Sequence, residues 1–236
     1  MNVLDTLIEK LLAEQPQYSE ITIPYNMAEK KRMFRTLVNT RLPFAIDEGF
    51  LRMQDSYLQH ELSEKGIVDI GQLEETQPRL VLWQGDITRL NADAIVNAAN
   101  SAMLGCFVPC HGCIDNAIHS FAGVQLRLKC HELMQAQGHD EATGVAKITP
   151  AYNLPSSYIL HTVGPIIQQN PTKEQCSELA SCYRSCFELA DSYDLKSVAY
   201  CCISTGEFHF PNRQAAEIAI KTVRDCLQTV FAIIEL

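Results

Sequence analysis

Short apolar runs alternate with long amphipathic stretches from about residue 79 onward. This alternation predicts strands separated by helices, and therefore an α/β fold with a layered, mostly parallel or mixed sheet. The expected strands lie in "RLVLWQGDI", "DAIVNAAN", "SYILHTVGP", "KSVAYCCIST" and "FAIIEL". The expected helices are "CIDNAIHSFAGVQLRLKCHELMQAQG", "TKEQCSELASCYRSCFELADSYD" and "NRQAAEIAIKTVRDCLQTV", the first of them a single long helix that ends at Gly138.

The first 78 residues differ in pattern and form a separate expected part. Apolar residues recur at helical spacing in "VLDTLIEKLLAEQ", "AEKKRMFRTLVNTR" and "DEGFLRMQDSYLQHEL", and Asp47 suits a helix start. "SEKGIVDIGQLEETQPRL" indicates a loop with a short extended segment. We therefore expect a helical N-terminal extension over residues 1–78 and an α/β domain over residues 79–236.

Charge and composition argue against several classes of protein. A formal net charge of −9 argues against nucleic-acid binding, which depends on Lys and Arg. The sequence has no apolar run near the ~18 residues of a membrane span. Its first twenty residues lack the basic start and apolar block of a secretory signal. We therefore expect a cytoplasmic protein whose ten cysteines are reduced and, outside residues 106–113, mostly buried.

Polar residues follow the first two expected strands. In a sheet of this kind ligands bind beyond the carboxyl ends of the strands, so these residues are candidates for a site. Asp86 can accept a hydrogen bond from an exocyclic amine such as adenine N6, and Asn97 and Asn100 can bond sugar hydroxyls. The same residue types also cap turns, and their spacing alone does not choose between the two roles.

The segment "CFVPCHGC", residues 106–113, contains three cysteines and a histidine ahead of an expected helix. Thiolates and imidazole suit tetrahedral zinc, and three protein ligands leave the fourth position open to water or substrate. With Cys110 as a fourth ligand, the site would be closed and structural. Cys110 and Cys113 also form a CxxC pattern, in which the helix N-terminus would lower a thiol pKa for redox chemistry. The residues alone leave these alternatives open.

Five ordered motifs carry a family resemblance. "GDIT…ADAIVNAAN", "CIDNAIHSFAG", "TGVAKITPAYNLP", "YILHTVGP" and "ISTGEFHFP" resemble the successive motifs of macrodomains, which bind ADP-ribose. "MLGCFVPCHGCIDN", together with the helical extension, resembles the zinc-dependent macrodomain branch, which is associated with removing ADP-ribose from proteins. The resemblance implies a three-layer α/β/α domain with a mixed central sheet.

The resemblance also implies how ADP-ribose would be held. Asp86 and the Ile87 amide would contact adenine, and Phe208 would pack on a sugar. Asn100 would hold the ribose next to the metal, in line with the sugar contacts expected of Asn97 and Asn100. The backbone amides of two loops would hold the diphosphate: Thr143, Gly144, Val145 and Ala146 in one, and Ser204, Thr205, Gly206, Glu207 and Phe208 in the other.

The same resemblance implies a metal and catalytic residues. Cys106, His111 and Cys113 would hold one Zn²⁺ per chain. The metal would polarise a ribose oxygen or the leaving carboxylate, or activate a bound water. Asp115 would orient or deprotonate that water, and Asn100 would position the ribose. His119 is expected to be a buried residue behind the site rather than a ligand.

The activity implied by the resemblance is enzymatic. A protein-ADP-ribose hydrolase of this branch would remove mono-ADP-ribose that is ester-linked to acidic residues of proteins. A lipoyl-carrier protein modified by a sirtuin-type transferase is one partner that the resemblance suggests. Two alternatives remain: a non-catalytic reader that binds ADP-ribose and has a structural zinc, and a thiol redox or metal-storage protein. Two phosphate-binding loops have no use in the last of these.

Overall fold

A seven-stranded mixed sheet forms the centre of the computed structural model, which describes residues 2–227 and 231–235. The strand order is β1-β2-β7-β6-β3-β5-β4, with five parallel strands between antiparallel edge strands β1 and β4. The strands are β1 (Glu75–Gln77), β2 (Leu80–Trp83), β3 (Ala94–Ala99), β4 (Ala146–Pro150), β5 (Tyr158–Val163), β6 (Ser197–Tyr200) and β7 (Phe231–Glu235).

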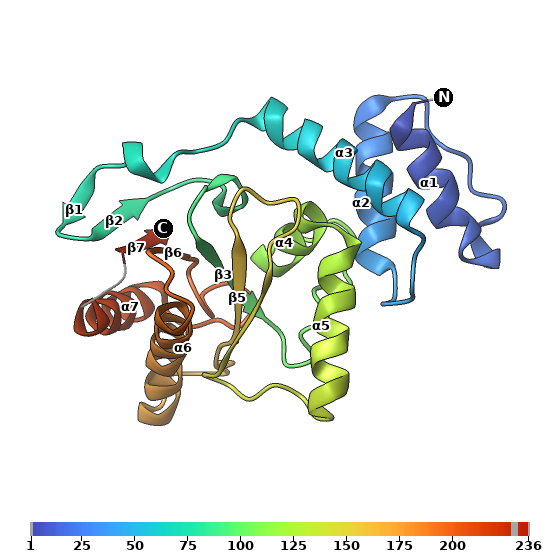
Figure 1. Ribbon diagram of the computed structural model, residues 1–236. Helices are drawn as coiled ribbons and strands as arrows, with labels where there is room; N and C mark the ends of the chain where they lie inside the picture. Colours follow the sequence, from blue (N-terminus) through green and yellow to red (C-terminus); the bar gives the residue numbers. More distant parts are fainter. Residues whose placement is uncertain (1, 228–230, 236) are drawn as a thin grey trace.

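Helices cover both faces of the sheet, so the predicted three-layer α/β/α arrangement is confirmed. Helices α4 and α5 lie on one side, and α6 and α7 lie on the other (Figure 1). Helices α1 to α3 pack outside α4 and α5 as the helical extension. The helices are α1 (Val3–Ala13), α2 (Met27–Thr40), α3 (Glu48–Lys65), α4 (Ile114–Ala122), α5 (Val124–Gln137), α6 (Lys173–Ser192) and α7 (Asn212–Cys226).

The extension has an apolar core of its own, which includes one residue of the α/β domain. Leu7 of α1, Phe34 of α2 and Phe50 of α3 are buried together, and Val124 at the start of α5 joins them. Within each helix, apolar residues at helical spacing share one face, and these faces are turned toward one another. The sheet begins at β1, inside the segment assigned to the extension, and the boundary at residues 78 and 79 stays a prediction.

Two elements differ from the sequence expectation. The predicted long helix is two helices, because Gly123 separates α4 from α5 at a φ of 99°, a backbone conformation that strains other residues. A side chain at this position would also collide with Gln54 of α3, at 2.5 Å from its Nε2. The expectation also omitted β4, which pairs antiparallel with β5.

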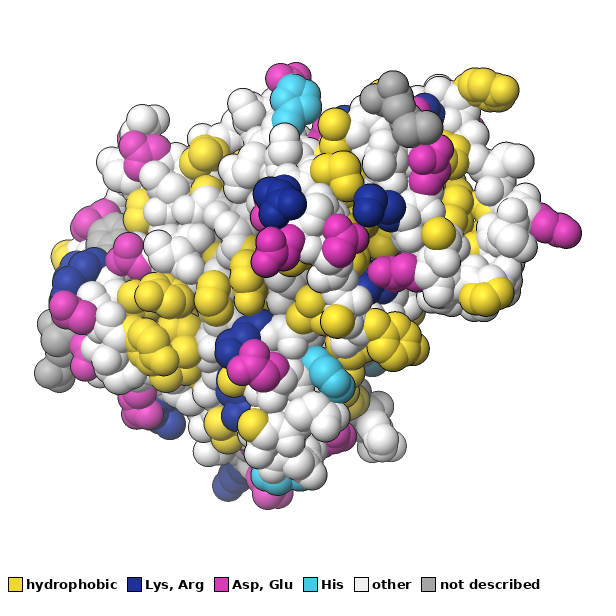
Figure 2. Space-filling view, turned by 45° about the vertical axis from the view of Figure 1, so that its right-hand side comes forward, with side chains coloured by type: hydrophobic (Ala, Val, Ile, Leu, Met, Phe, Trp, Pro, Cys, Tyr) yellow, Lys and Arg dark blue, Asp and Glu magenta, His cyan; other side chains and the backbone are white. Residues whose placement is uncertain are grey.

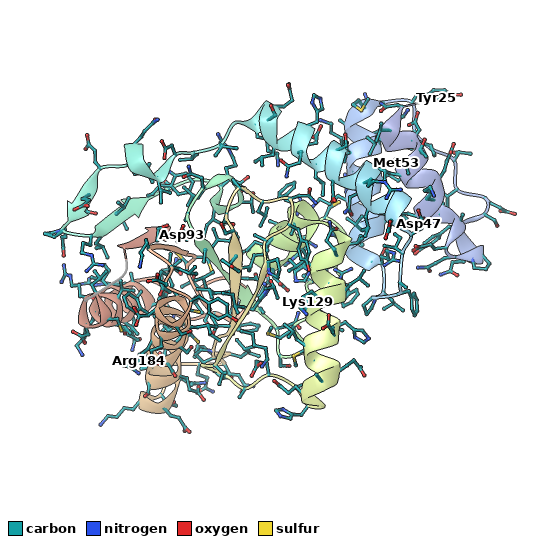
Figure 3. All side chains as sticks on the ribbon, viewed as in Figure 1. Tyr25, Asp47, Met53, Asp93, Lys129 and Arg184 are labelled. Atoms are coloured by element: carbon teal, nitrogen blue, oxygen red, sulfur yellow. The ribbon has the colours of Figure 1, made fainter. Side chains whose placement is uncertain are left out.

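Asp93 links the amino ends of two neighbouring strands, β3 and β6. Its carboxylate accepts hydrogen bonds from the amides of Lys196 (2.6 Å) and Ser197 (3.0 Å). These contacts join the amino ends of β3 and β6 at the position labelled in Figure 3. The carboxyl ends of the same strands, and the loops that follow them, therefore lie together at the opposite end of the sheet.

The surface gives no sign of a single basic face in the view of Figure 2, where basic and acidic side chains are interspersed. Among the helices that the structure describes, none combines the length and apolar character needed to cross a bilayer.

We expect the free energy of unfolding to fall as the pH is lowered, because His161 is buried in its neutral form. Asn97 Nδ2 donates to its Nδ1 (3.2 Å), and its Nε2 lies 2.9 Å from Thr149 Oγ1. Burial lowers the pKa of His161 to about 3. As the pH falls below about 6.5, the unfolded chain therefore binds a proton at His161 before the folded protein does. Between about pH 6.5 and pH 3, this residue lowers the free energy of unfolding by up to about 1.4 kcal/mol per pH unit.

Denaturant unfolding of the wild type and His161→Gln at pH 7.5, 6.0 and 5.0 checks this expectation. The variant lacks the titrating ring, so its unfolding free energy should fall less steeply with acidification than that of the wild type. Equal slopes would contradict the assignment, whatever the absolute stabilities of the two proteins.

Candidate functional site

A cavity of about 760 Å³ opens at the carboxyl ends of β3 and β6, which are neighbours in the sheet. This volume is within the range of small-molecule sites. Most of the lining comes from three segments: residues 98–100, 105–115 and 201–208. The loop before α4 and the loop after β6 thus face one another across the cavity.

The loop of residues 104–113, called the metal loop below, carries the candidate metal ligands. The donor atoms of Cys106, His111 and Cys113 lie within 4.8 Å of one another, and Cys106 Sγ is 3.7 Å from His111 Nδ1. Tetrahedral zinc holds sulfur and nitrogen ligands about 3.5–3.8 Å apart, so small side-chain adjustments suffice for this set to fit the ion. All three residues line the cavity, so the fourth coordination position of a bound zinc would be open to water or substrate.

Cys110 faces away from this set. Its Sγ lies 3.4 Å from Thr36 Oγ1 and 3.5 Å from the carbonyl oxygen of Arg32, both in α2. This orientation favours three ligands over a closed set of four. It also argues against a CxxC redox pair, as does the Cys113 thiol, whose pKa burial raises to about 11, whereas a reactive CxxC thiol needs a lowered one.

A glycine shapes the start of the metal loop. Gly105 has a φ of 79°, and a side chain there would approach the ring of His119 to 2.7 Å. His119 is itself buried, with Nε2 3.6 Å from Asp115 Oδ1. Its burial agrees with the expectation of a buried residue behind the site.

Asp115 lies in the first turn of α4 and lines the cavity with only 5% of its surface exposed. Asn97 Nδ2 donates to its Oδ1 (2.8 Å), and Asn100 Nδ2 lies 3.4 Å from its Oδ2. Burial raises the pKa of Asp115 to about 6, and the Asn97 hydrogen bond and the Arg127 charge partly oppose this shift. The carboxylate is therefore nearly buried and held in place where it borders the cavity.

The loop after β6 lines the opposite wall with Ser204, Thr205, Gly206, Glu207 and Phe208. A side chain added at Gly206 would meet nothing within 4 Å, so the backbone there borders open space. Such a backbone can approach a phosphate closely.

Two parts of the site meet at His111. The Glu207 side chain reaches across to it, with Oε1 3.4 Å from His111 Nε2, while Nδ1 faces Cys106. The cavity thus gathers the expected metal ligands, both catalytic candidates and the second phosphate loop.

The remaining candidates lie outside the lining of the cavity. Asp86 caps the short 3-10 helix at Ile87–Arg89 through a hydrogen bond from the Thr88 amide (3.1 Å), and Ile87 is buried. Asn97 is fully buried, so its contact with Asp115 places it behind the cavity wall.

The first phosphate-loop candidates, residues 143–146, also lie outside this lining. Residues 143–145 precede β4, and Ala146 is its first residue. Because β4 runs antiparallel to β5, these residues lie at the carboxyl end of β5, the end of the sheet at which the cavity opens. The Gly144 amide donates to the carbonyl oxygen of Val163 (3.0 Å), whereas Val145 is 43% exposed.

Sequence reasoning missed three contributors to the site. The Glu207 side chain was not singled out, only its amide. Arg127 of α5 was not considered, although its buried guanidinium donates to the carbonyl oxygen of Leu104 (2.6 Å) at the start of the metal loop. Cys202, expected to be buried, is exposed and lines the cavity, because β6 ends at Tyr200 and the chain has left the sheet by that point.

A second set of possible donors, His119, Cys130 and His161, is buried in the core. Both ring nitrogens of His161 already have hydrogen-bonding partners. Burial lowers the pKa of His119 well below its usual value, and the nearby Arg127 charge lowers it further. A buried cation beside that guanidinium would be repelled, so we assign no metal to this set.

The cavity, the mixed sheet and the facing loops define a ligand-binding α/β/α domain, and comparison with known proteins identifies its family. Residues 96–219 match the Macro domain family. A Treponema medium protein named protein-ADP-ribose hydrolase is 53% identical over 223 residues, which cover 93% of this chain and 85% of that protein. A protein of the same name from Staphylococcus aureus strain MSSA476 is 44% identical, with 95% of this chain and 85% of the relative covered.

Solved structures agree with this assignment. The Trypanosoma brucei macrodomain in complex with ADP-ribose has a TM-score of 0.63 and 30% identity, covering 85% of this chain and 89% of that one. The Oceanobacillus iheyensis macrodomain with ADP has a TM-score of 0.60 and 38% identity, covering 66% and 80% respectively. The chain belongs to the macrodomain family.

Proposed function

We propose that this protein is a zinc-dependent hydrolase that removes mono-ADP-ribose from ester-linked acidic residues of proteins. The observation that carries the proposal is the position of Asp115, which lines the same cavity as the three metal-donor side chains. A reader of ADP-ribose needs neither group. The relatives named protein-ADP-ribose hydrolase support the same reaction.

ADP-ribose would occupy the cavity with its diphosphate along the loop of residues 204–208. The open backbone at Gly206 supports this placement, because peptide amides can bind phosphate without a basic side chain. Asp86 and Ile87 remain our candidates for the adenine end. Thr143, Val145 and Ala146 remain candidates for phosphate contacts at the same end of the sheet, whereas the Gly144 amide already donates to the carbonyl oxygen of Val163.

Cys106, His111 and Cys113 would hold one Zn²⁺, which supplies a Lewis acid or lowers the pKa of a bound water. Asp115 would orient the attacking water and accept its proton, since Asn97 holds the carboxylate from behind. Asn100 would position the ribose, because its side chain lines the cavity next to Asp115.

Release of ADP-ribose from a protein mono-ADP-ribosylated on Asp or Glu tests the proposal. The purified protein is assayed as isolated, after chelation, and after zinc is returned, with metal content measured on each sample. We expect release that disappears on chelation and returns with zinc. Binding of ADP-ribose without release by the zinc-loaded protein would instead make it a reader.

The identity of the protein substrate needs a separate comparison. A lipoyl-carrier protein modified by a sirtuin-type transferase is the partner we propose, and an unrelated protein with the same ester linkage is the matched control. Faster release from the carrier supports this partner, and equal rates would limit recognition to the linkage.

Glu207 is expected to orient the His111 ring. A carboxylate that accepts from the second ring nitrogen of a ligand histidine fixes the ring and its tautomer. We expect Glu207→Gln to weaken zinc binding by about 10-fold, since such partners typically contribute 10–100-fold and this one is largely exposed. Competition with a chromogenic chelator measures this change. Glu217→Gln, at an exposed position of α7, removes the same charge and should leave the affinity unchanged.

A further inference from the structure

Helix α2 of the extension lies against α4 (Figure 1). Two of its polar side chains form hydrogen bonds with the metal loop. Arg35 and Asn39 are four residues apart and therefore project from the same face of α2. Both make hydrogen bonds to the backbone of the metal loop, on the side away from the cavity.

Arg35 holds the loop at His111. Its guanidinium donates to the carbonyl oxygen of His111 (3.0 Å) and, through two nitrogens, to Asn116 Oδ1 (2.7 and 3.2 Å). Asn116 in turn donates to the carbonyl oxygen of Val108 (2.9 Å). The Arg35 guanidinium thus holds the candidate ligand His111 directly, and it holds Val108 in the middle of the loop through Asn116.

Asn39 holds the loop one residue earlier. Its Oδ1 accepts from the Cys110 amide (2.9 Å), and its Nδ2 donates to Ser120 Oγ of α4 (2.8 Å). Asn39 is 1% exposed, so both contacts are shielded from water. Cys110 has a φ of 51°, an unusual conformation for a residue with a side chain, and the Asn39 contact helps to maintain it.

The start of the loop is tied to the extension by Arg127. This side chain donates to the carbonyl oxygens of Val38 (2.8 Å) and Arg41 (2.6 Å), at the end of α2, as well as to Leu104 (2.6 Å). Three side chains, Arg35, Asn39 and Arg127, therefore support the metal loop, and each of them belongs to α2 or bonds to the backbone at its end.

We propose that α2 is a positioning element of the metal site, in which Arg35 and Asn39 hold the metal loop in the shape that brings its three ligands together. The extension is then a part of the site rather than an appended helical unit. This inference rests on the proposed zinc site, but the ordering of the metal loop by α2 can be measured without metal.

Zinc affinity of the 236-residue chain gives the first test, with the metal alone as probe and a chromogenic chelator as competitor. Arg35→Gln and Asn39→Ala should each weaken zinc binding about 10–100-fold, the usual effect of removing a residue that supports a ligand. Arg32→Gln is the matched control, because Arg32 is exposed and loses the same charge one turn away. Arg35→Lys keeps the charge with fewer donors and should recover part of the affinity.

Hydrogen exchange of the metal-free proteins gives the second test. We expect the Cys110 amide to exchange at least about 10-fold faster in Asn39→Ala, because it loses its acceptor. Thermal unfolding of each variant separates a local effect from global destabilisation. If the wild type binds no zinc, the proposed function fails, yet the exchange result still tests the role of α2. Zinc affinity and Cys110 exchange that match those of Arg32→Gln in both variants would overturn the inference.

Discussion

Replacing Cys113 by serine is expected to lower release of ADP-ribose at least about 1000-fold, because several kcal/mol of metal-derived stabilisation of the transition state would be lost. Serine is chosen because Cys113 also caps α4, its Sγ accepting from the Asn116 amide (3.4 Å). A serine hydroxyl is a good N-cap, so the helix should persist while the ligand is removed. Initial rates on the esterified protein, with zinc content of each sample, measure the effect.

Cys110→Ser distinguishes the ligand sets in the same experiment. Cys110 contacts α2 instead of the three donors, so this variant should retain one zinc per chain. Loss of zinc in Cys110→Ser but not in Cys113→Ser would show that the ligand set is different. Unchanged activity in metal-free Cys113→Ser would remove the metal from the reaction altogether.

Asp115→Asn is expected to lower kcat by about 100- to 10,000-fold, the range for loss of a general base, with zinc content unchanged. Asparagine keeps an oxygen that can accept from Asn97 Nδ2, so the side chain should stay in place. The unfolding temperature should not fall, because burial raises the pKa of Asp115 and the folded protein therefore disfavours the charged form.

Calorimetric titration with ADP-ribose completes the test of Asp115. The dissociation constant should remain within about 3-fold of the wild type, since the residue is expected to act mainly in the transition state. Asn97→Ala is an informative companion, because it removes the support of the carboxylate without removing the carboxylate itself. Wild-type kcat in Asp115→Asn would assign the base to another group.

Five of the strands (β2, β3, β5, β6 and β7) and the loops that follow them were predictable because each is encoded locally. The apolar run of β3 and the amides that follow it are adjacent in sequence, and the resemblance pointed to both sides of the cavity. The break between α4 and α5 was missed because Gln54, 69 residues earlier in the chain, lies so close to Gly123 that an added side chain would come within 2.5 Å of its Nε2. Local helical spacing continues across that glycine and gives no sign of the contact.

The supports of the metal loop were missed for a related reason. Arg35 and Asn39 look like ordinary polar residues on a surface helix, and nothing in α2 alone shows that its polar face meets a loop 71 to 76 residues away. Arg127 likewise lies in a stretch of helical spacing, where a charged residue is normally exposed. Pairings between distant segments determine these roles, and a single sequence does not display them.

The contact between Gly105 and the ring of His119 has a consequence for how this protein can change over generations. Any side chain at position 105 would have to displace a buried ring that lies beside Asp115, and would also have to adopt a left-handed backbone. No single nearby substitution relieves both problems. Lineages that keep the activity should therefore accept mutations around this glycine far more readily than a mutation of it, although it is neither a ligand nor a base.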